Sequence, residues 1–187
     1  MGFQRGFKTW ASSVALGARN ELGIGQFDAL DPWLLADHLD IPVIGLSSLV
    51  GDAPAVEHLL TVEPEAFSAV TVFDGTRRIV VHNDSHAEVR QNSNICHELS
   101  HGLLNHPPTP ALDDRGCRVW SQRIEDEATW LAGCLLVSEP ATLAVARGTL
   151  SIAEAAVRLG VSRQMMQFRL NATGAIKRVS RAGAGRR

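Results

Sequence analysis

The sequence predicts an α+β fold, in which a small β-sheet stands between helical segments and a short basic helical unit follows near the end of the chain. Three observations lead to this class. Two β-rich runs, residues 70–73 and 77–82, are joined through Asp74-Gly75, a strong hairpin signal. Two long stretches with helical periodicity come after this hairpin. A pair of shorter helical stretches follows them.

Local signals predict the elements before the hairpin. Residues 7–22 have apolar and small side chains at helical spacing, which predicts an amphipathic helix that ends at glycines. Asp31 is expected to cap a second, short helix that has Pro32 in its first turn. Residues 41–46 are short and β-branched, so they are expected to form a strand.

Two long helices are expected after the hairpin. The first covers residues 91–105 and ends before Pro107-Pro108, because proline cannot continue a helix. A proline-rich and polar loop then leads to the second helix, over residues 119–137, which Pro140 is expected to close. The fold is therefore expected to contain two helices long enough to pack along each other.

Composition places the chain among globular proteins. Its 187 residues are 45% apolar, which is enough for a hydrophobic core. We find neither a run of about 18 apolar residues nor the apolar region of a signal peptide after the first ten residues, so a soluble, cytoplasmic protein is expected. The odd set of cysteines, Cys96, Cys117 and Cys134, is interpreted as reduced thiols.

The net charge of −2 conceals two regions of opposite sign. Residues 1–146 hold 9 Lys/Arg against 19 Asp/Glu, whereas residues 147–187 hold 9 Lys/Arg against Glu154 alone. A basic end of this kind is suited either to an acidic partner, including nucleic acid, or to a solvated surface.

The most informative motif is His97-Glu98-Leu99-Ser100-His101, which lies within the first long helix. Histidines at i and i+4 stack on one helical face, where both imidazoles can reach one Zn²⁺. Glu98 is then placed to accept a proton from a zinc-bound water without binding the metal itself. The motif predicts a zinc site with a catalytic base.

A catalytic zinc site needs a third protein ligand. His106 does not fit the metzincin pattern, which requires glycine at position 104 and histidine at position 107, where the chain has leucine and proline. The second long helix offers Glu125 and Glu127. Glu125 is favoured because Ala128, Thr129 and Ala132 share its face and would let the two helices lie close together. Glu127 points about 200° around the helix and is expected to be a solvated carboxylate.

The segment from Ile95 to His106, followed by the segment from Glu125 to Val137, resembles the ImmA/IrrE family of metallopeptidases. That family has an HExxH helix with a leucine-rich continuation and then an ExxA helix that ends in small and apolar residues. Val161-Ser162, Arg169-Leu170 and Gly174 also resemble its usual ending. The likeness covers roughly residues 11–174.

The resemblance implies a zincin-like helical core and an endopeptidase of the gluzincin type. It implies His97, His101 and Glu125 as ligands of one Zn²⁺ per chain, with Glu98 as the catalytic base. The implied substrate is a helix-turn-helix repressor or antitoxin, cut to relieve repression in stress-response or mobile-element control. Two positions depart from the family pattern. Thr129 replaces the usual Asn or Asp, and Ser138 stands where proline is common.

The group that would stabilise the oxyanion of the reaction is left open by the sequence. With no tyrosine in the chain, the candidates are His82, His86, His106 and Arg123, any of which can instead be an ordinary surface residue. The strand over residues 77–82 is expected to lie at the edge of the sheet, where it could pair with an extended peptide substrate.

Residues 152–170 have the spacing of a helix-turn-helix, with Gly160 at the turn and Ser151 and Ser162 as N-caps. Met166 and Leu170 are expected on its inner face, and three arginines are expected on its outer face. These are Arg158, Arg163 and Arg169. A DNA-binding regulator is therefore the alternative function, although a structural or partner-docking role is favoured.

The expected organisation has three parts. Residues 1–140 form the zincin-like metallopeptidase domain, residues 141–175 form the small helical segment packed on it, and residues 176–187 form a basic, disordered tail. A third interpretation is a zinc site that has become a non-catalytic scaffold. The presence of Glu98 argues against it, because a structural zinc site does not need a base.

Overall fold

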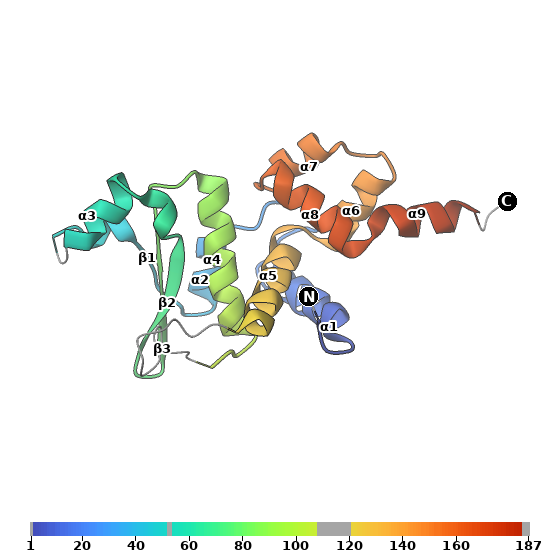
Figure 1. Ribbon diagram of the computed structural model, residues 1–187. Helices are drawn as coiled ribbons and strands as arrows, with labels where there is room; N and C mark the ends of the chain where they lie inside the picture. The colour runs from blue at the N-terminus through green and yellow to red at the C-terminus, as the bar shows by residue number, and fades with distance from the viewer. Residues whose placement is uncertain (1, 52–53, 108–120, 185–187) are drawn as a thin grey trace.

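The computed structural model describes residues 2–51, 54–107 and 121–184, and over these residues it confirms the predicted α+β class. Figure 1 shows a small sheet on one side of α4, and α5 and α1 on the other side. The α-helices are α1 (Phe7–Glu21), α2 (Pro32–His38), α3 (Pro54–Thr61), α4 (Glu88–Leu103), α5 (Gln122–Leu136), α6 (Glu139–Ala146), α7 (Ile152–Arg158), α8 (Arg163–Thr173) and α9 (Ala175–Ala184). Two short 3-10 helices are η1 (Leu46–Leu49) and η2 (Pro64–Ala66).

The sheet has the strand order β1-β3-β2. Strand β3 (Arg77–His82) is central: it pairs in parallel with β1 (Val43–Gly45) and antiparallel with β2 (Ala69–Asp74). The expectation that residues 77–82 form an edge strand is therefore wrong, because β1 covers that side of β3. The outer edge of the hairpin belongs to β2.

The hairpin turn differs by one residue from the prediction. Asp74 pairs with Arg77, so the two central residues of the turn are Gly75 and Thr76, not Asp74 and Gly75. Of these two, only Gly75 has a positive φ, at 60°. A positive φ at the first central residue is the requirement of a type II′ turn, which explains why glycine stands there.

Helix α1 packs against α5 through its smallest residues. Its buried stripe consists of Ala11, Ala15, Ala18 and Arg19, whereas Trp10 is 48% exposed. Arg19 is 1% exposed and donates hydrogen bonds to the main-chain oxygens of Leu135, Gly25 and Asp28. The guanidinium thus ties α5 to the loop that follows α1 and satisfies carbonyls that would otherwise be buried without partners.

The chain between α2 and β2 contains a helix that we did not predict, α3. By contrast, Asp31 caps α2 as predicted, accepting a hydrogen bond of 2.9 Å from the amide of Trp33.

Pro140 was expected to close α5, but it lies beyond the end of that helix. It lies in the first turn of α6, where Ser138 is the N-cap and also donates to the main-chain oxygen of Gln26.

The predicted pair of helices around Gly160 is present as α7 and α8. Ser151 and Ser162 cap them, and Gly160 has a φ of 64°. Met166 and Leu170 are buried as expected. Arg169, however, is not outside: it is 1% exposed and lies against α5. Gly133 makes this burial feasible, because a Cβ at that position would lie 2.8 Å from Cδ of Arg169.

Residues expected to begin a disordered tail instead form α9, which contacts α6 and α8. Alanine and arginine have high helix propensity, and Arg178 of α9 forms an ion pair with Glu139 of α6. In Figure 1, α9 extends away from the rest of the C-terminal helices.

Cys96 and Cys134 are buried free thiols, and burial raises the pKa of Cys96 well above its ordinary value. Cys117 lies outside the described residues, as does most of the predicted loop between α4 and α5.

In the described part of the chain no single helix is both long and apolar enough to cross a membrane. The pair α5 and α6, bent by 70°, meets those criteria only when the two are taken together.

Candidate metal centre

Helix α4 presents His97 and His101 on one face. Their Nε2 atoms lie 3.2 Å apart and their ring centroids 4.9 Å apart, as expected for residues one helical turn apart. Ile95 and Leu99, which are fully buried, anchor α4 to the core. The helix therefore holds both imidazoles at a surface that faces α5.

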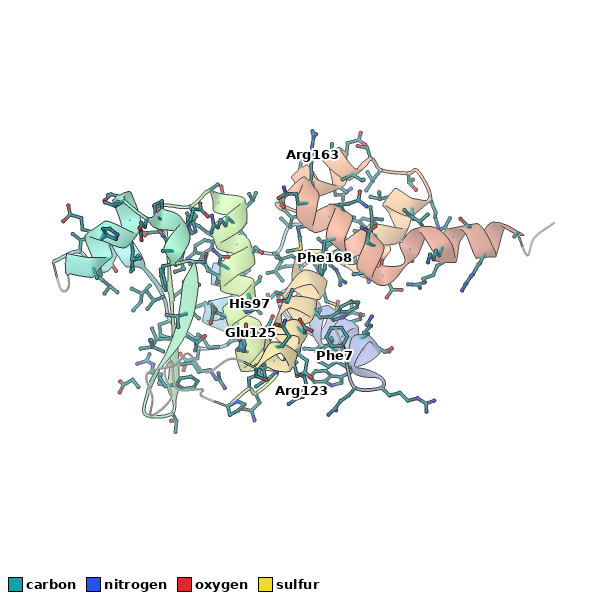
Figure 2. All side chains as sticks on the ribbon, viewed as in Figure 1. Phe7, His97, Arg123, Glu125, Arg163 and Phe168 are labelled. Carbon is teal, nitrogen blue, oxygen red and sulfur yellow. The ribbon has the colours of Figure 1, made fainter. Side chains whose placement is uncertain are left out.

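Helix α5 brings Glu125 to the same point, as Figure 2 shows for Glu125 and His97. Its Oε2 lies 3.1 Å from Nε2 of His97 and 3.8 Å from Nε2 of His101. The close approach depends on small side chains, because Ala128 and Ala132 of α5 are both buried. The predicted small-residue face thus lies inside the molecule.

The three donor atoms fit a tetrahedral zinc site. Zinc bonds of about 2.0–2.1 Å keep neighbouring ligand atoms about 3.3 Å apart, and the three separations here are 3.2, 3.1 and 3.8 Å. Two imidazoles and one carboxylate are a donor set of catalytic zinc sites. The side chains of His97 and Glu125 are 26% and 24% exposed, so the site is accessible from solvent.

The pKa of His101 favours metal binding. Burial, together with the neighbouring His97 ring, lowers the pKa of His101 to about 4. The imidazole is therefore neutral near pH 7, and a neutral imidazole is the form that binds a metal.

Glu98 lies beside the metal-site residues and is held from the sheet. Oγ1 of Thr71, on β2, donates a 2.7 Å hydrogen bond to Oε2 of Glu98. Burial raises the pKa of Glu98, while the Thr71 hydrogen bond and the proximity of His97 offset part of this rise. A carboxylate whose pKa is raised towards neutrality is better suited to accept and return a proton. No local pattern in the sequence points to Thr71, because its contact with Glu98 depends on how β2 packs on α4.

A series of side-chain contacts begins at the Nδ1 side of the His101 ring. Nδ1 of His106 lies 2.9 Å from Nδ1 of His101, and Nε2 of His106 lies 3.3 Å from Oε2 of Glu127. Arg123 completes the line by donating to Oε1 of Glu127 at 3.0 Å.

The expectation of a solvated Glu127 is therefore wrong. The residue is 7% exposed, because His106 folds back after α4 and covers it. The sequence contained a signal for this arrangement: Arg123 and Glu127 are spaced i and i+4 on one helix.

The four candidates for stabilising the oxyanion have different surroundings in the structure. His82 is buried and meets the ring of Trp33, with a centroid distance of 5.7 Å, and His86 is buried with Nε2 2.9 Å from the main-chain oxygen of Pro64. Within the described part of the chain, neither is hydrogen-bonded to His97 or His101. His106 reaches His101 but has both ring nitrogens engaged. Arg123 is 57% exposed and pairs with Glu127.

Thr129 occupies the position where the family pattern commonly has Asn or Asp. Its Oγ1 lies 3.5 Å from Nδ1 of His97, at the outer limit of a hydrogen bond. The hydroxyl can therefore orient His97, but only weakly.

Comparison with known proteins agrees with this geometry. The model of the family described as IrrE N-terminal-like domain, Peptidase_M78, matches residues 56–171, which include α4, α5 and the three donor residues. No curated protein matches the chain. The match covers more than half of the chain and confirms the resemblance, and the chain belongs to the IrrE N-terminal-like, M78 family of metallopeptidases.

Proposed function

We propose that the chain is a zinc-dependent endopeptidase with His97, His101 and Glu125 as the ligands of one Zn²⁺. Family membership supports a metallopeptidase-type function in general. The observation that carries the more specific proposal is the convergence of the three donor atoms, all within 4.8 Å of one another. A carboxylate that does not belong to this set, Glu98, stands next to them.

Glu98 is the proposed general base. Zinc bound to the three ligands would supply the Lewis acid that polarises the scissile carbonyl and activates water. Glu98 accepts one proton as the water oxygen bonds to the carbonyl carbon. It then returns this proton to the amine when the carbon–nitrogen bond breaks, so the carboxylate is regenerated. Thr71 keeps Glu98 in place through both transfers.

The outer edge of β2 is the proposed binding surface for the substrate. In the described part of the chain β2 pairs only with β3, so no described strand uses the main-chain groups along its other edge. Val70 and Val72 are each 41% exposed, whereas Thr71 between them points to Glu98. A peptide added to this edge of β2 would run past Glu98, the proposed base. Strand β3 cannot bind a peptide in this way, because β1 and β2 pair with both of its edges.

The proposed substrate is a helix-turn-helix repressor or antitoxin, as the family resemblance implies. Co-incubation with the repressor encoded beside this gene tests the proposal. We expect the zinc-loaded chain to cut that repressor at one position, identified by the masses of the two products. Cleavage should stop with a chelator and return when zinc is restored. An intact repressor after incubation with the zinc-loaded chain would contradict this choice of substrate.

DNA binding by the C-terminal helices is the second candidate function. It is favoured by the α7–α8 pair and by Arg158, whose side chain is 54% exposed, and Arg163, which is also exposed. Figure 2 shows Arg163 at the outer end of α8. DNA binding that weakens steeply with salt, and that weakens further in Arg163→Ala of the full chain, would support this role. Absence of duplex binding at low salt would exclude DNA binding and leave the peptidase as the remaining candidate function.

A further inference from the structure

Arg169 is a buried cation without a counter-charge. Its side chain is 1% exposed, and its Nη2 donates to Sγ of Cys134 at 3.2 Å. Nε and Nη1 have no hydrogen-bond partner, and no carboxylate in the described part of the chain forms an ion pair with it. Fully buried arginines are rare unless they are paired. The guanidinium therefore differs from that of Arg19, whose Nη atoms are bonded to three main-chain oxygens.

A cavity of about 540 Å³ lies next to this cation. Its walls come from α1, α5, α6, α8 and α9, so it lies where the C-terminal helices meet α1 and α5. Figure 1 shows α1 and the C-terminal helices on the side of α5 away from α4. None of the residues of the candidate metal centre lines the cavity.

The charges along the cavity are unbalanced. Four cations line it, namely Lys8, Arg19, Arg169 and Arg178, against one carboxylate, that of Glu139. Glu139 is already paired with Arg178. The ammonium of Lys8 lies 4.2 Å from the ring centroid of Trp130, and the guanidinium carbon of Arg169 lies 5.4 Å from it. Two cations thus gather around one indole with no acidic residue paired to either in the described chain.

We propose that this cavity binds a small organic anion, with a carboxylate or phosphate group near Arg169 and Lys8 and an apolar body in the rest of the space. The volume is typical of sites for small organic ligands. Leu16, Leu143 and Trp130 supply an apolar wall, and Ser12 and Thr173 supply hydroxyl groups. Such a ligand would provide the counter-charge that Arg169 lacks.

Calorimetric titration of the zinc-loaded full chain tests the proposal. The probes are benzoate and phenyl phosphate, which distinguish the two anionic groups, and neutral benzyl alcohol as the control. We expect saturable binding of at least one anion at one site per chain, and no saturable binding of the alcohol. The same binding is expected in His97→Ala, because the cavity is separate from the metal centre. Loss of anion binding in His97→Ala would place the anion on the metal and overturn the proposal.

Substitutions then locate the site. Arg169→Met and Lys8→Met should weaken anion binding by roughly tenfold to a hundredfold each, since each removes a charged partner. Lys177→Met is the matched control, because Lys177 is an exposed cation on α9 that does not line the cavity, and it should leave the affinity unchanged. If Arg169→Met does not fold, Ala172→Leu, which fills part of the cavity, must abolish binding. The proposal would be overturned if Lys8→Met and Ala172→Leu both bound the anion with the affinity of the original chain. It would also be overturned if the original chain showed no saturable anion binding.

Discussion

Nδ1 of His106 lies 2.9 Å from Nδ1 of His101, so a hydrogen bond between the two rings requires one Nδ1 to donate and the other to accept. For His101 to offer Nε2 to a metal, its proton must be on Nδ1, from which it donates to His106. The proton of His106 is then on Nε2 and is donated to Glu127. Arg123 holds the far oxygen of that carboxylate. The four residues form a hydrogen-bonded series that favours the tautomer of His101 with a free Nε2, which is the tautomer that the proposed zinc site requires.

We expect His106→Phe to weaken zinc binding about tenfold to a hundredfold, because it removes the acceptor for Nδ1–H of His101. Chelator competition measures the affinity. His106→Gln, whose amide can both accept and donate, should restore part of it. Asp126→Asn is the control, since Asp126 is bonded by Gln122 and lies outside this chain of contacts. Unchanged affinity in His106→Phe would show that His101 needs no such support.

Glu98→Gln should retain zinc and lose peptide hydrolysis by at least about a hundredfold, because an amide cannot accept the proton of the attacking water. His97→Ala should lose both zinc and hydrolysis. Metal content per chain and the rate of product formation are measured on the same samples. Full activity of Glu98→Gln would refute the proposed mechanism.

Thr71→Val should lower the hydrolysis rate by roughly tenfold to a hundredfold while zinc content stays constant, since the hydrogen bond to the charged Glu98 is lost without a change of shape. Thr71→Ser retains the hydroxyl and should recover most of the rate. A Thr71→Val enzyme as active as the original, or a Thr71→Ser enzyme as slow as Thr71→Val, would exclude a positioning role for the hydroxyl.

His82 is expected to make the folded chain sensitive to acid. Burial lowers the pKa of His82, although the carboxylate of Asp84 opposes the effect. The unfolded chain therefore takes up a proton near pH 6.5, where the folded chain does not. Stability falls as the pH drops below that value, by at most about 1.4 kcal/mol per pH unit for one group.

His82→Phe tests this expectation, because it keeps a ring against Trp33 and removes the titration. Its free energy of unfolding, measured by urea titration between pH 8 and pH 5, should depend less on pH than that of the original chain. Parallel pH profiles for the two proteins would rule out His82 as a source of the acid sensitivity.

Gly133→Ala should destabilise the fold by about 1–3 kcal/mol, because the added methyl would lie 2.8 Å from Cδ of the buried Arg169. Gly17→Ala is the matched control. It is also a helical glycine, but nothing lies within 4 Å of its Cβ position, so the substitution should stabilise α1 by about 0.5–1 kcal/mol. Thermal unfolding measures both, and equal effects would argue against tight packing at Gly133.

The features that the sequence predicted correctly depend on near neighbours. Asp31 and Pro32 at the start of α2, and Gly160 between α7 and α8, act within a few residues of their own position. The stacking of His97 and His101 is likewise a property of one helix. The position of Glu125, near His97 and His101, also depends on which residues share a face of α5, whereas its role as a ligand stays a proposal.

The errors concern contacts between distant segments. Strand β3 appeared to be an edge because its partner β1 lies more than thirty residues earlier in the chain. Arg169 seemed to belong outside because its spacing on α8 does not reveal that Gly133 of α5 leaves room for it. Glu127 seemed solvated because its burial depends on His106 after the end of α4. In each case a segment elsewhere in the chain decides the environment.

If the proposed peptidase binds its substrate along the β2 edge that no described strand pairs with, that edge limits which part of a substrate can be cut. Residues in an α-helix have their main-chain donors and acceptors engaged with each other, so they cannot add to a strand. A folded helix-turn-helix protein would therefore present its scissile bond in an extended connection between folded units, or would have to unwind locally first. Cleavage would then separate the DNA-reading part of a repressor from the rest while leaving each folded unit intact.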